Sequence, residues 1–209
     1  MKCPKCIMLN SLKIIFTILP VIFSLTQACS NNENENLREL TFKVNQALLG
    51  EKFIDNDLGF SFSPPKSCLP ISEQKIQKIN DRLKKETAVA NSFEVEPRTV
   101  FLNENDQFVC VISILPTLSD ADSAITAYQQ AIESLYVNSQ VSQAVFNHNG
   151  FRIYQSLITN QNIVQFRLVV IQTLGKSFQI DYVIQKSIYQ DNLEAIESSI
   201  GSLTKLKDS

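Results

Sequence analysis

Four stretches with strand-like patterns follow one another in the C-terminal part of the chain, and they constrain its fold more than any other feature. They cover residues 141–146, 151–159, 163–173 and 178–184. The connections between them are short and carry Asn-Gly, Asn-Gln-Asn and Gly-Lys sequences, which suit tight turns. Strands joined by tight turns pair antiparallel. The sequence therefore predicts a four-stranded antiparallel meander.

The remaining elements predict an α+β domain. Residues 108–115 are almost continuously apolar and rich in β-branched side chains, which is typical of a central strand covered on both faces. Strands are also expected at residues 98–102 and, around a turn, within 53–62; amphipathic helices are expected at 72–86, 119–137 and 187–206. Residues 37–49 predict a short helix or, alternatively, an ordered arm. Together these elements predict an antiparallel β-sheet flanked by helices.

The N-terminus carries a short apolar stretch at residues 14–25, directly after Lys13. Spanning a bilayer as a helix takes about 20 apolar residues. A basic flank, a short apolar region and small residues after it are typical of a secretory signal peptide. Next comes Leu-Thr-Gln-Ala-Cys at residues 25–29, which resembles the lipobox of bacterial lipoproteins. That resemblance implies a lipid on Cys29, which would become the first residue of the mature chain.

The expected organisation is then a signal peptide at residues 1–28, a lipidated polar tether at 29–36 and a single α+β domain at 37–209, with its core at about 50–207. A secreted protein cut near Ala28 and a retained N-terminal anchor are the alternatives. Cys3 and Cys6 have no second pair at zinc-ribbon spacing, so we assign them to the leader, whether translation starts at Met1 or Met8. Removal of residues 1–28 takes away three lysines and no acidic residue, so the net charge changes from −2 to −5.

Composition narrows the possible functions. A nearly balanced charge argues against nucleic acid as a partner. With 5 Gly and 1 His, the chain has little material for glycine-rich phosphate loops or histidine-based metal sites. His148 lies in an Asn-rich turn sequence and is expected to face solvent. Asp55 and Asp57 lack the spacing of a calcium loop, and turn chemistry explains them. We therefore expect no catalytic residues, no metal and no cofactor.

Two cysteines remain in the expected domain, Cys68 and Cys110. Export would place them where disulfides form, and a bond closing this loop of about forty residues would add roughly 3–4 kcal/mol of stability. The alternative is that Cys110, inside an apolar strand, is a small buried hydrophobic residue. The pair is a possible disulfide.

Three segments of the chain resemble the Mog1/PsbP-like family. They are GFSFSPP at residues 59–65, VCVISILP at 109–116 and the stretch 164–184 that precedes the last helix. Cys68 departs from the pattern, because relatives often have a tryptophan after the early proline. The resemblance implies an α/β/α sandwich and a partner-binding scaffold without shared catalytic residues. Bacterial members of that family include lipoproteins of the cell envelope.

These observations together predict a non-enzymatic cell-envelope lipoprotein. It would be anchored by its lipid to a bacterial membrane, facing the periplasm or the cell surface, and would act as a protein-binding or assembly module. The alternative is a periplasmic carrier of a small ligand, with a pocket between the sheet and the helices. An open surface rimmed by polar groups would favour the module, and a deep apolar pocket would favour the carrier.

Overall fold

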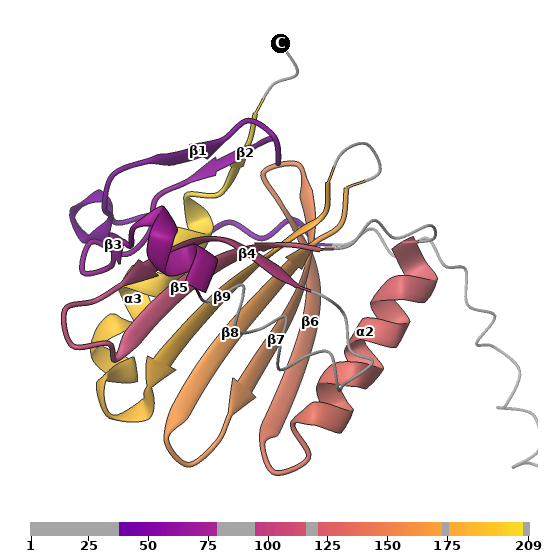
Figure 1. The fold of residues 1–209 in the computed structure, drawn as a ribbon. Helices are drawn as coiled ribbons and strands as arrows, with labels where there is room; N and C mark the ends of the chain where they lie inside the picture. Colours follow the sequence, from indigo (N-terminus) through magenta and orange to yellow (C-terminus); the bar gives the residue numbers. More distant parts are fainter. Residues whose placement is uncertain (1–37, 79–94, 116–120, 173–175, 207–209) are drawn as a thin grey trace, which may run out of the picture. The chain divides into compact units, whose positions relative to one another are not determined.

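The computed structural model describes residues 38–78, 95–115, 121–172 and 176–206, and these fold as an α+β domain (Figure 1). They belong to one compact unit, Leu37–Ser209. The expected signal peptide and tether lie outside the described residues. Within the described part of the chain, no helix is long and apolar enough to cross a membrane.

The larger sheet has seven strands, and every neighbouring pair in it is antiparallel. The order is β3-β4-β5-β9-β8-β7-β6. The strands are β3 (Leu69–Pro70), β4 (Glu96–Leu102), β5 (Phe108–Ile114), β6 (Gln140–His148), β7 (Phe151–Thr159), β8 (Ile163–Val170) and β9 (Phe178–Gln185). The last four form the expected meander, and β5 is the expected central strand.

A second sheet of three strands contains β1 (Phe53–Asp55), β2 (Phe60–Phe62) and β10 (Thr204–Lys205) in the order β1-β2-β10. The first two strands are the expected hairpin. The third differs from the sequence prediction of a helix over residues 187–206, because α3 (Tyr189–Gly201) ends earlier. Gly201 and Ser202 are poor helix formers, and beyond them Thr204 pairs with Ser61 instead of continuing the helix.

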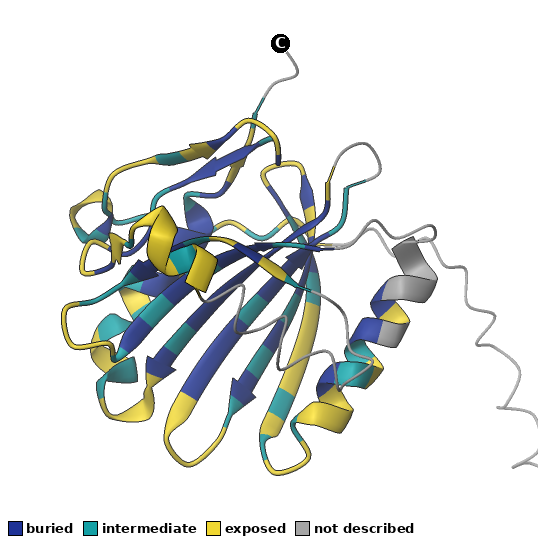
Figure 2. Cartoon of the chain, in the orientation of Figure 1, coloured by how far each residue is buried: buried dark blue, intermediate teal, exposed yellow. Residues whose placement is uncertain are grey.

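The main core lies between one face of the large sheet and α3. Alternate residues of β9, from Phe178 to Ile184, point into it and meet Ile196 and Ile200 of α3. The hairpin adds Phe60, whose ring stacks on Phe178 with centroids 4.2 Å apart. Most of the central strands are buried in Figure 2, because both faces of the sheet are covered. The alternation of core-facing residues along β9 gives the period of two that is typical of a strand.

A second, smaller cluster covers the opposite face of the same sheet. Helix α2 (Ala121–Leu135) places Ile125, Tyr128 and Ile132 in this cluster, where they pack against residues of β7 and β8. The sheet is therefore layered between α2 and α3, which confirms the expected antiparallel sheet flanked by helices. The expected helix at 72–86 is helical at residues 73–78, and its remainder lies outside the described residues.

Residues 38–49 form an arm rather than the predicted helix. The arm is extended except for the 3₁₀ turn η2 (Gln46–Leu48). It is held to the end of β6, where the Leu40 amide donates to the Asn147 carbonyl at 2.8 Å. Its Phe42 packs against Phe146. Leu40 and Phe42 pack against the main core. Tertiary packing therefore overrides the helical spacing of the apolar residues, and the alternative, an ordered arm, is correct.

Candidate functional site

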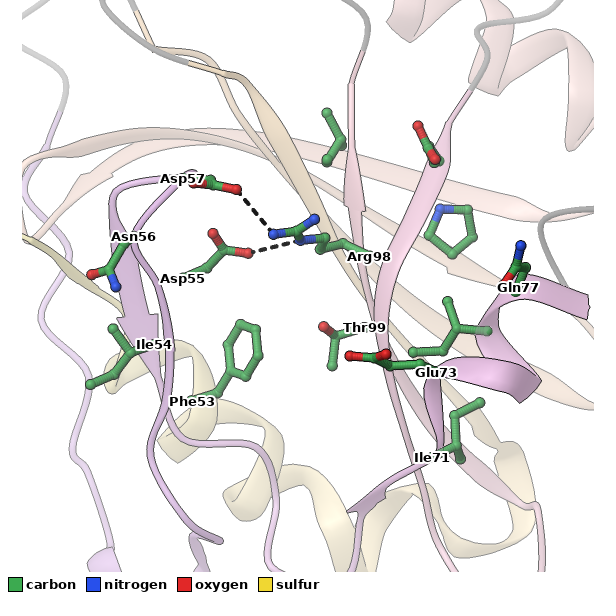
Figure 3. Close-up of a pocket in the computed structure, with 14 residues that line it drawn as sticks. Phe53, Ile54, Asp55, Asn56, Asp57, Ile71, Glu73, Gln77, Arg98 and Thr99 are labelled. Atoms are coloured by element: carbon green, nitrogen blue, oxygen red, sulfur yellow. Dashed lines mark hydrogen bonds and ion pairs between the residues drawn. The ribbon is translucent and has the colours of Figure 1, made fainter.

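A cleft of about 910 Å³ opens between the two sheets. One wall consists of β1 and the turn after it, at residues 53–57, and the other consists of residues 96–99 of β4 with part of the stretch 71–77 (Figure 3). Ile114 of β5 completes the lining. Three segments that are far apart in the sequence thus meet at one surface.

The cleft borders the edges of two strands. Side chains alternate between the two faces of a strand, so a cavity over one face contacts every second residue. Here three consecutive residues of β1, Phe53, Ile54 and Asp55, all line the cleft, as do all four residues from Glu96 to Thr99 of β4. The opposite edge of β1 pairs with β2, and that of β4 pairs with β5. The other edge of β4 pairs with β3 only at Phe101 and Leu102. The cleft therefore runs along the remaining edge of β1 and along the part of β4, residues 96–99, that β3 does not cover.

Arg98 joins the two walls. The pairing of β4 with β5 is irregular between Pro97 and Thr99, so Arg98 is not in register with β5. Its Nε lies 3.4 Å from Oδ2 of Asp55, and its Nη2 lies 3.1 Å from Oδ2 of Asp57. Asp55 is buried and also accepts the Leu58 amide at 3.0 Å, so it shapes the turn as the sequence predicted. The ion pairs hold the β1–β2 turn against β4.

Among the residues that the structure describes, carboxylates outnumber cations in the cleft. Asp55, Asp57, Glu73 and Glu96 line it together with one arginine from that part of the chain. Glu73 and Glu96 are exposed, and their carboxylates form no ion pair or hydrogen bond with any residue that the structure describes. The lining also includes apolar side chains from both walls, and Ile54 is 53% exposed. The surface combines uncovered apolar groups with negative charge, which suits a ligand that is apolar and basic.

The described residues contain no group of three His, Cys, Asp or Glu side chains arranged to hold a metal ion. In the cleft, the two aspartates both form ion pairs with the guanidinium of Arg98, and the two glutamates come from different segments. Among the described lining residues there is also no cysteine, serine or histidine to act as a nucleophile or base.

Cys29, the expected lipid attachment site, lies outside the described residues. Cys68 and Cys110 are both buried in the main core, and both are free thiols. Cys68 donates a long hydrogen bond of 3.8 Å to the Phe108 carbonyl on β5, two residues before Cys110. Burial raises the pKa of Cys68 to about 11 against a weaker opposing hydrogen bond from Ser67. Burial, together with the neighbouring charges of Cys68 and Asp181, raises the pKa of Cys110 well above its usual value. A disulfide between them stays a prediction.

His148 is buried, so the expectation that it faces solvent is wrong. Its Nδ1 lies 2.8 Å from the Leu40 carbonyl oxygen, and its Nε2 lies 3.1 Å from the Asn149 side-chain nitrogen. Phe42 meets the ring edge-to-face at 5.0 Å. The arm and α3 cover a residue whose own sequence neighbours form a turn. With these partners, the imidazole has a structural role at the joint between the arm and the domain.

A buried polar network lies on the sheet face that α2 covers. Asp181 of β9 accepts hydrogen bonds from Arg167 at 2.8 Å and from Gln165 at 2.9 Å. Gln179 donates to the same carboxylate and accepts from Tyr128 of α2. Burial raises the pKa of Tyr128. For Arg167, burial lowers the pKa, but the charge and hydrogen bond of Asp181, together with Tyr128 and Tyr136, outweigh this effect and raise it. The network fixes how α2 sits on the sheet.

Sequence reasoning did not find the cleft. Its two walls are formed by residues 53–57 and 96–99, which are about forty positions apart. The available signal was local: Pro97 and Arg98 interrupt the apolar pattern at the start of a strand, as expected at a strand edge or a bulge. Nothing in the sequence indicates that Arg98 would meet Asp55.

Comparison with known proteins gave two structural likenesses at low sequence identity. The solution structure of cyanobacterial PsbP (CyanoP) from Synechocystis sp. PCC 6803 matches with a TM-score of 0.46 and 12% identity, covering 76% of this chain and 93% of that chain. The crystal structure of LpqN, involved in cell envelope biogenesis of Mycobacterium tuberculosis, matches with a TM-score of 0.43 and 14% identity, covering 76% and 86%. No protein-family model and no curated protein matches the sequence.

Proposed function

We propose that this chain is a cell-envelope lipoprotein, anchored to a bacterial membrane through lipid on Cys29, whose α+β domain is a non-enzymatic protein-binding or assembly module. The partner docks at the cleft between β1 and β4. The observation that carries this proposal is the chemistry of that cleft: an open surface between two strand edges, with uncovered apolar groups and two unengaged carboxylates.

The anchor is supported by the sequence. The short apolar stretch, the small residue Ala28 and the cysteine that follows it have the order of a lipoprotein signal. A single acyl chain holds a protein only marginally at a membrane, whereas two or more chains give stable anchoring. Cys29 stands eight residues before the compact unit that begins at Leu37, so the lipid and the domain are separated by a short polar linker.

The form of the cleft favours the module over the carrier. A pocket for a small apolar ligand encloses most of the ligand's surface and has only a few polar groups. The described walls of this cleft instead carry four carboxylates and an arginine, and Ile54 and Arg98 are about half exposed. Such a mixture of apolar and charged side chains resembles a protein-binding surface, in which uncovered apolar groups lie within a polar rim.

Substitution Cys29→Ser tests the anchor. The expected result is loss of incorporation of an alkyne-labelled fatty acid and a shift of the protein from the detergent phase to the aqueous phase in Triton X-114 partitioning. Cys6→Ser is the control, because Cys6 lies in the expected leader and its replacement leaves lipidation unchanged. A Cys29→Ser protein that still incorporates the fatty acid and stays in the detergent phase contradicts the anchor.

Site-specific photo-crosslinking tests the module. A benzoylphenylalanine placed at Asn56, which is exposed and lines the cleft, is expected to form an adduct with one envelope protein in intact cells. The same probe at Gln190, which is exposed on α3, serves as the control. The docking site is wrong if no protein adduct forms at Asn56, or if both positions give the same adducts.

A further inference from the structure

We propose that the cleft binds an extended segment of the partner protein, which adds a strand to the free edge of β1 and places basic side chains against the carboxylates of the cleft. This inference rests on the proposed function and deepens it, because it specifies the chemistry of the partner. It predicts a recognition mode in which backbone hydrogen bonds provide the attachment and side chains provide the specificity.

The edge of β1 is the first argument. One edge of β1 pairs with β2 from Phe53–Phe62 to Asp55–Phe60. In the part of the chain that the structure describes, no strand pairs with the other edge, and β1 is the end strand of its sheet. Since all three residues of β1 line the cleft, that free edge faces it. Backbone N–H and C=O groups along such an edge form a template for a further strand.

The opposite wall is less suited to strand addition. Proline has no N–H to donate, and Pro97 stands in the middle of the β4 segment that lines the cleft. Next to it, the guanidinium of Arg98 already lies between Asp55 and Asp57 at one end of the cleft. The opposite wall therefore contributes side chains rather than a ladder of hydrogen bonds. Strand addition is assigned to β1.

The side chains of the cleft determine what the added strand carries. Ile54 is 53% exposed and Ile71 is half-buried, and both line the cleft as apolar contacts for every second residue of an incoming strand. The carboxylates of Glu73 and Glu96 lie on the other wall without a partner among the described residues. An alternating segment of apolar and basic residues matches both requirements, because the two faces of a strand carry different side chains.

Other occupants fit the lining less well. An acidic segment would bring like charges close to unpaired glutamates. A small organic cation would satisfy the carboxylates but would leave Ile54 and the free edge of β1 uncovered. Strand addition by an apolar–basic segment is the one arrangement that uses the edge, the apolar groups and the charges together.

The test uses the purified full chain and synthetic peptides, with binding measured by fluorescence anisotropy at low salt. The probe is a ten-residue peptide of alternating valine and lysine. Two further peptides are a valine–glutamate version and a valine–lysine version with alternate backbone amides methylated, which cannot add to a strand edge. The first peptide is expected to bind, and the other two are expected to bind at least tenfold more weakly.

A matched pair of variants locates the site. Glu73→Gln with Glu96→Gln removes two charges from the cleft, and the expected weakening of valine–lysine binding is about 5- to 30-fold at low salt. Glu104→Gln with Glu133→Gln removes the same number of charges from exposed positions outside the cleft, and it is expected to change the affinity less than twofold. All four glutamates are exposed, so both variants are expected to fold.

Each opposite result overturns a defined part of the inference. Equal binding of the methylated peptide refutes strand addition, and equal binding of the valine–glutamate peptide refutes recognition of basic side chains. If the two double variants weaken peptide binding equally, the binding site is not in the cleft. If neither lysine peptide binds while the adduct at Asn56 still forms, the partner chemistry is wrong and the proposed function stands. If the adduct is also absent, both are wrong.

Discussion

Replacing Gly201 with alanine is expected to destabilise the domain, although alanine is normally the better helix former. Gly201 is the last residue of α3, and the arm passes directly over it. A Cβ atom at this position would lie 2.6 Å from Cβ of Phe42 and 2.8 Å from Cγ2 of Val44. Carbon atoms in good contact are about 3.5–4.0 Å apart. The arm or the helix must therefore move when the methyl group is added.

Two opposing effects determine the size of the loss. Alanine in place of glycine within a helix gains up to about 1 kcal/mol. Overpacking of a filled contact costs about 1–3 kcal/mol. The cost lies in the upper part of that range because the arm is held on both sides of Phe42: Leu40 donates to Asn147, and the Asn45 amide donates to Ser198 at 3.0 Å. The expected net loss is about 1–2 kcal/mol of unfolding free energy.

Urea unfolding followed by far-UV circular dichroism measures this loss, with the full chain in one detergent buffer throughout. Gly50→Ala is the control substitution. Gly50 has no positive φ, and a Cβ added there would come no closer than 3.4 Å to another atom. It removes the same flexibility from the unfolded chain, so it is expected to be neutral or to stabilise by a few tenths of a kcal/mol.

A double-mutant cycle distinguishes a clash from a general defect. Phe42→Ala retains the Cβ atom that Gly201 approaches, whereas Phe42→Gly removes it. Gly201→Ala is therefore expected to stay destabilising beside Phe42→Ala and to lose, beside Phe42→Gly, the part of its cost that comes from Phe42, while the contact with Val44 remains. A Gly201→Ala protein at least as stable as the wild type, or equal relief by the two Phe42 variants, would refute the packing of the arm against α3.

Two further predictions concern the interior. Asp181→Leu leaves the guanidinium of Arg167 buried without its partner, so it is expected to lower the free energy of unfolding in urea by about 3–5 kcal/mol. The double variant Asp181→Leu with Arg167→Met removes the buried charge as well and is expected to lose less. A double variant as unstable as the single one contradicts this. Because burial raises the pKa of Cys68 from 9.0 to about 11, the thiol ionises first in the unfolded chain, and its contribution to stability is full below pH 9 and declines as the pH rises through 11. In urea unfolding between pH 8 and 11, the free energy of unfolding is expected to fall with pH for the wild type and to fall less steeply for Cys68→Ala. Equal dependence on pH in the two proteins would contradict a role for the buried thiol. Intact mass after denaturation and alkylation without reductant distinguishes the two states of Cys68 and Cys110: modification of both shows free thiols, as in the structure, and an unmodified pair establishes the disulfide.

The elements that the sequence predicted correctly are those with a local, regular pattern. The meander of β6–β9 and the buried strand β5 follow from alternation and apolar content over seven to nine residues, bounded by turn sequences. The arm at residues 38–49 was ambiguous because its apolar spacing fits a helix equally well. The strand β10 was missed because a two-residue strand has no pattern of its own, and its existence depends on pairing with Ser61, far away in the chain.

The same distinction applies to the site. Turn chemistry at Asp55 was predictable, because its acceptor role for Leu58 involves residues three apart. Its ion pair with Arg98 was not, because it joins positions 43 residues apart across two sheets. The prediction that His148 faces solvent was wrong for the same reason. Its neighbours form a turn, but its burial depends on Leu40, which is 108 residues away. Burial and charge pairing at such positions are properties of the assembled fold.

The arrangement of the strands also bears on how an anchored domain would present its cleft. The described chain begins beside β6, where Arg38 and Leu40 flank Asn147. The cleft lies at β4, which is five strands away in the order β4-β5-β9-β8-β7-β6. Neighbouring strands are about 4.8 Å apart, so this separation is about 24 Å. A partner strand added at β1 therefore does not compete with the arm for β6. Because the arm and the partner would use different strand edges, packing of the arm against β6 and binding at the cleft can occur in the same molecule at the same time.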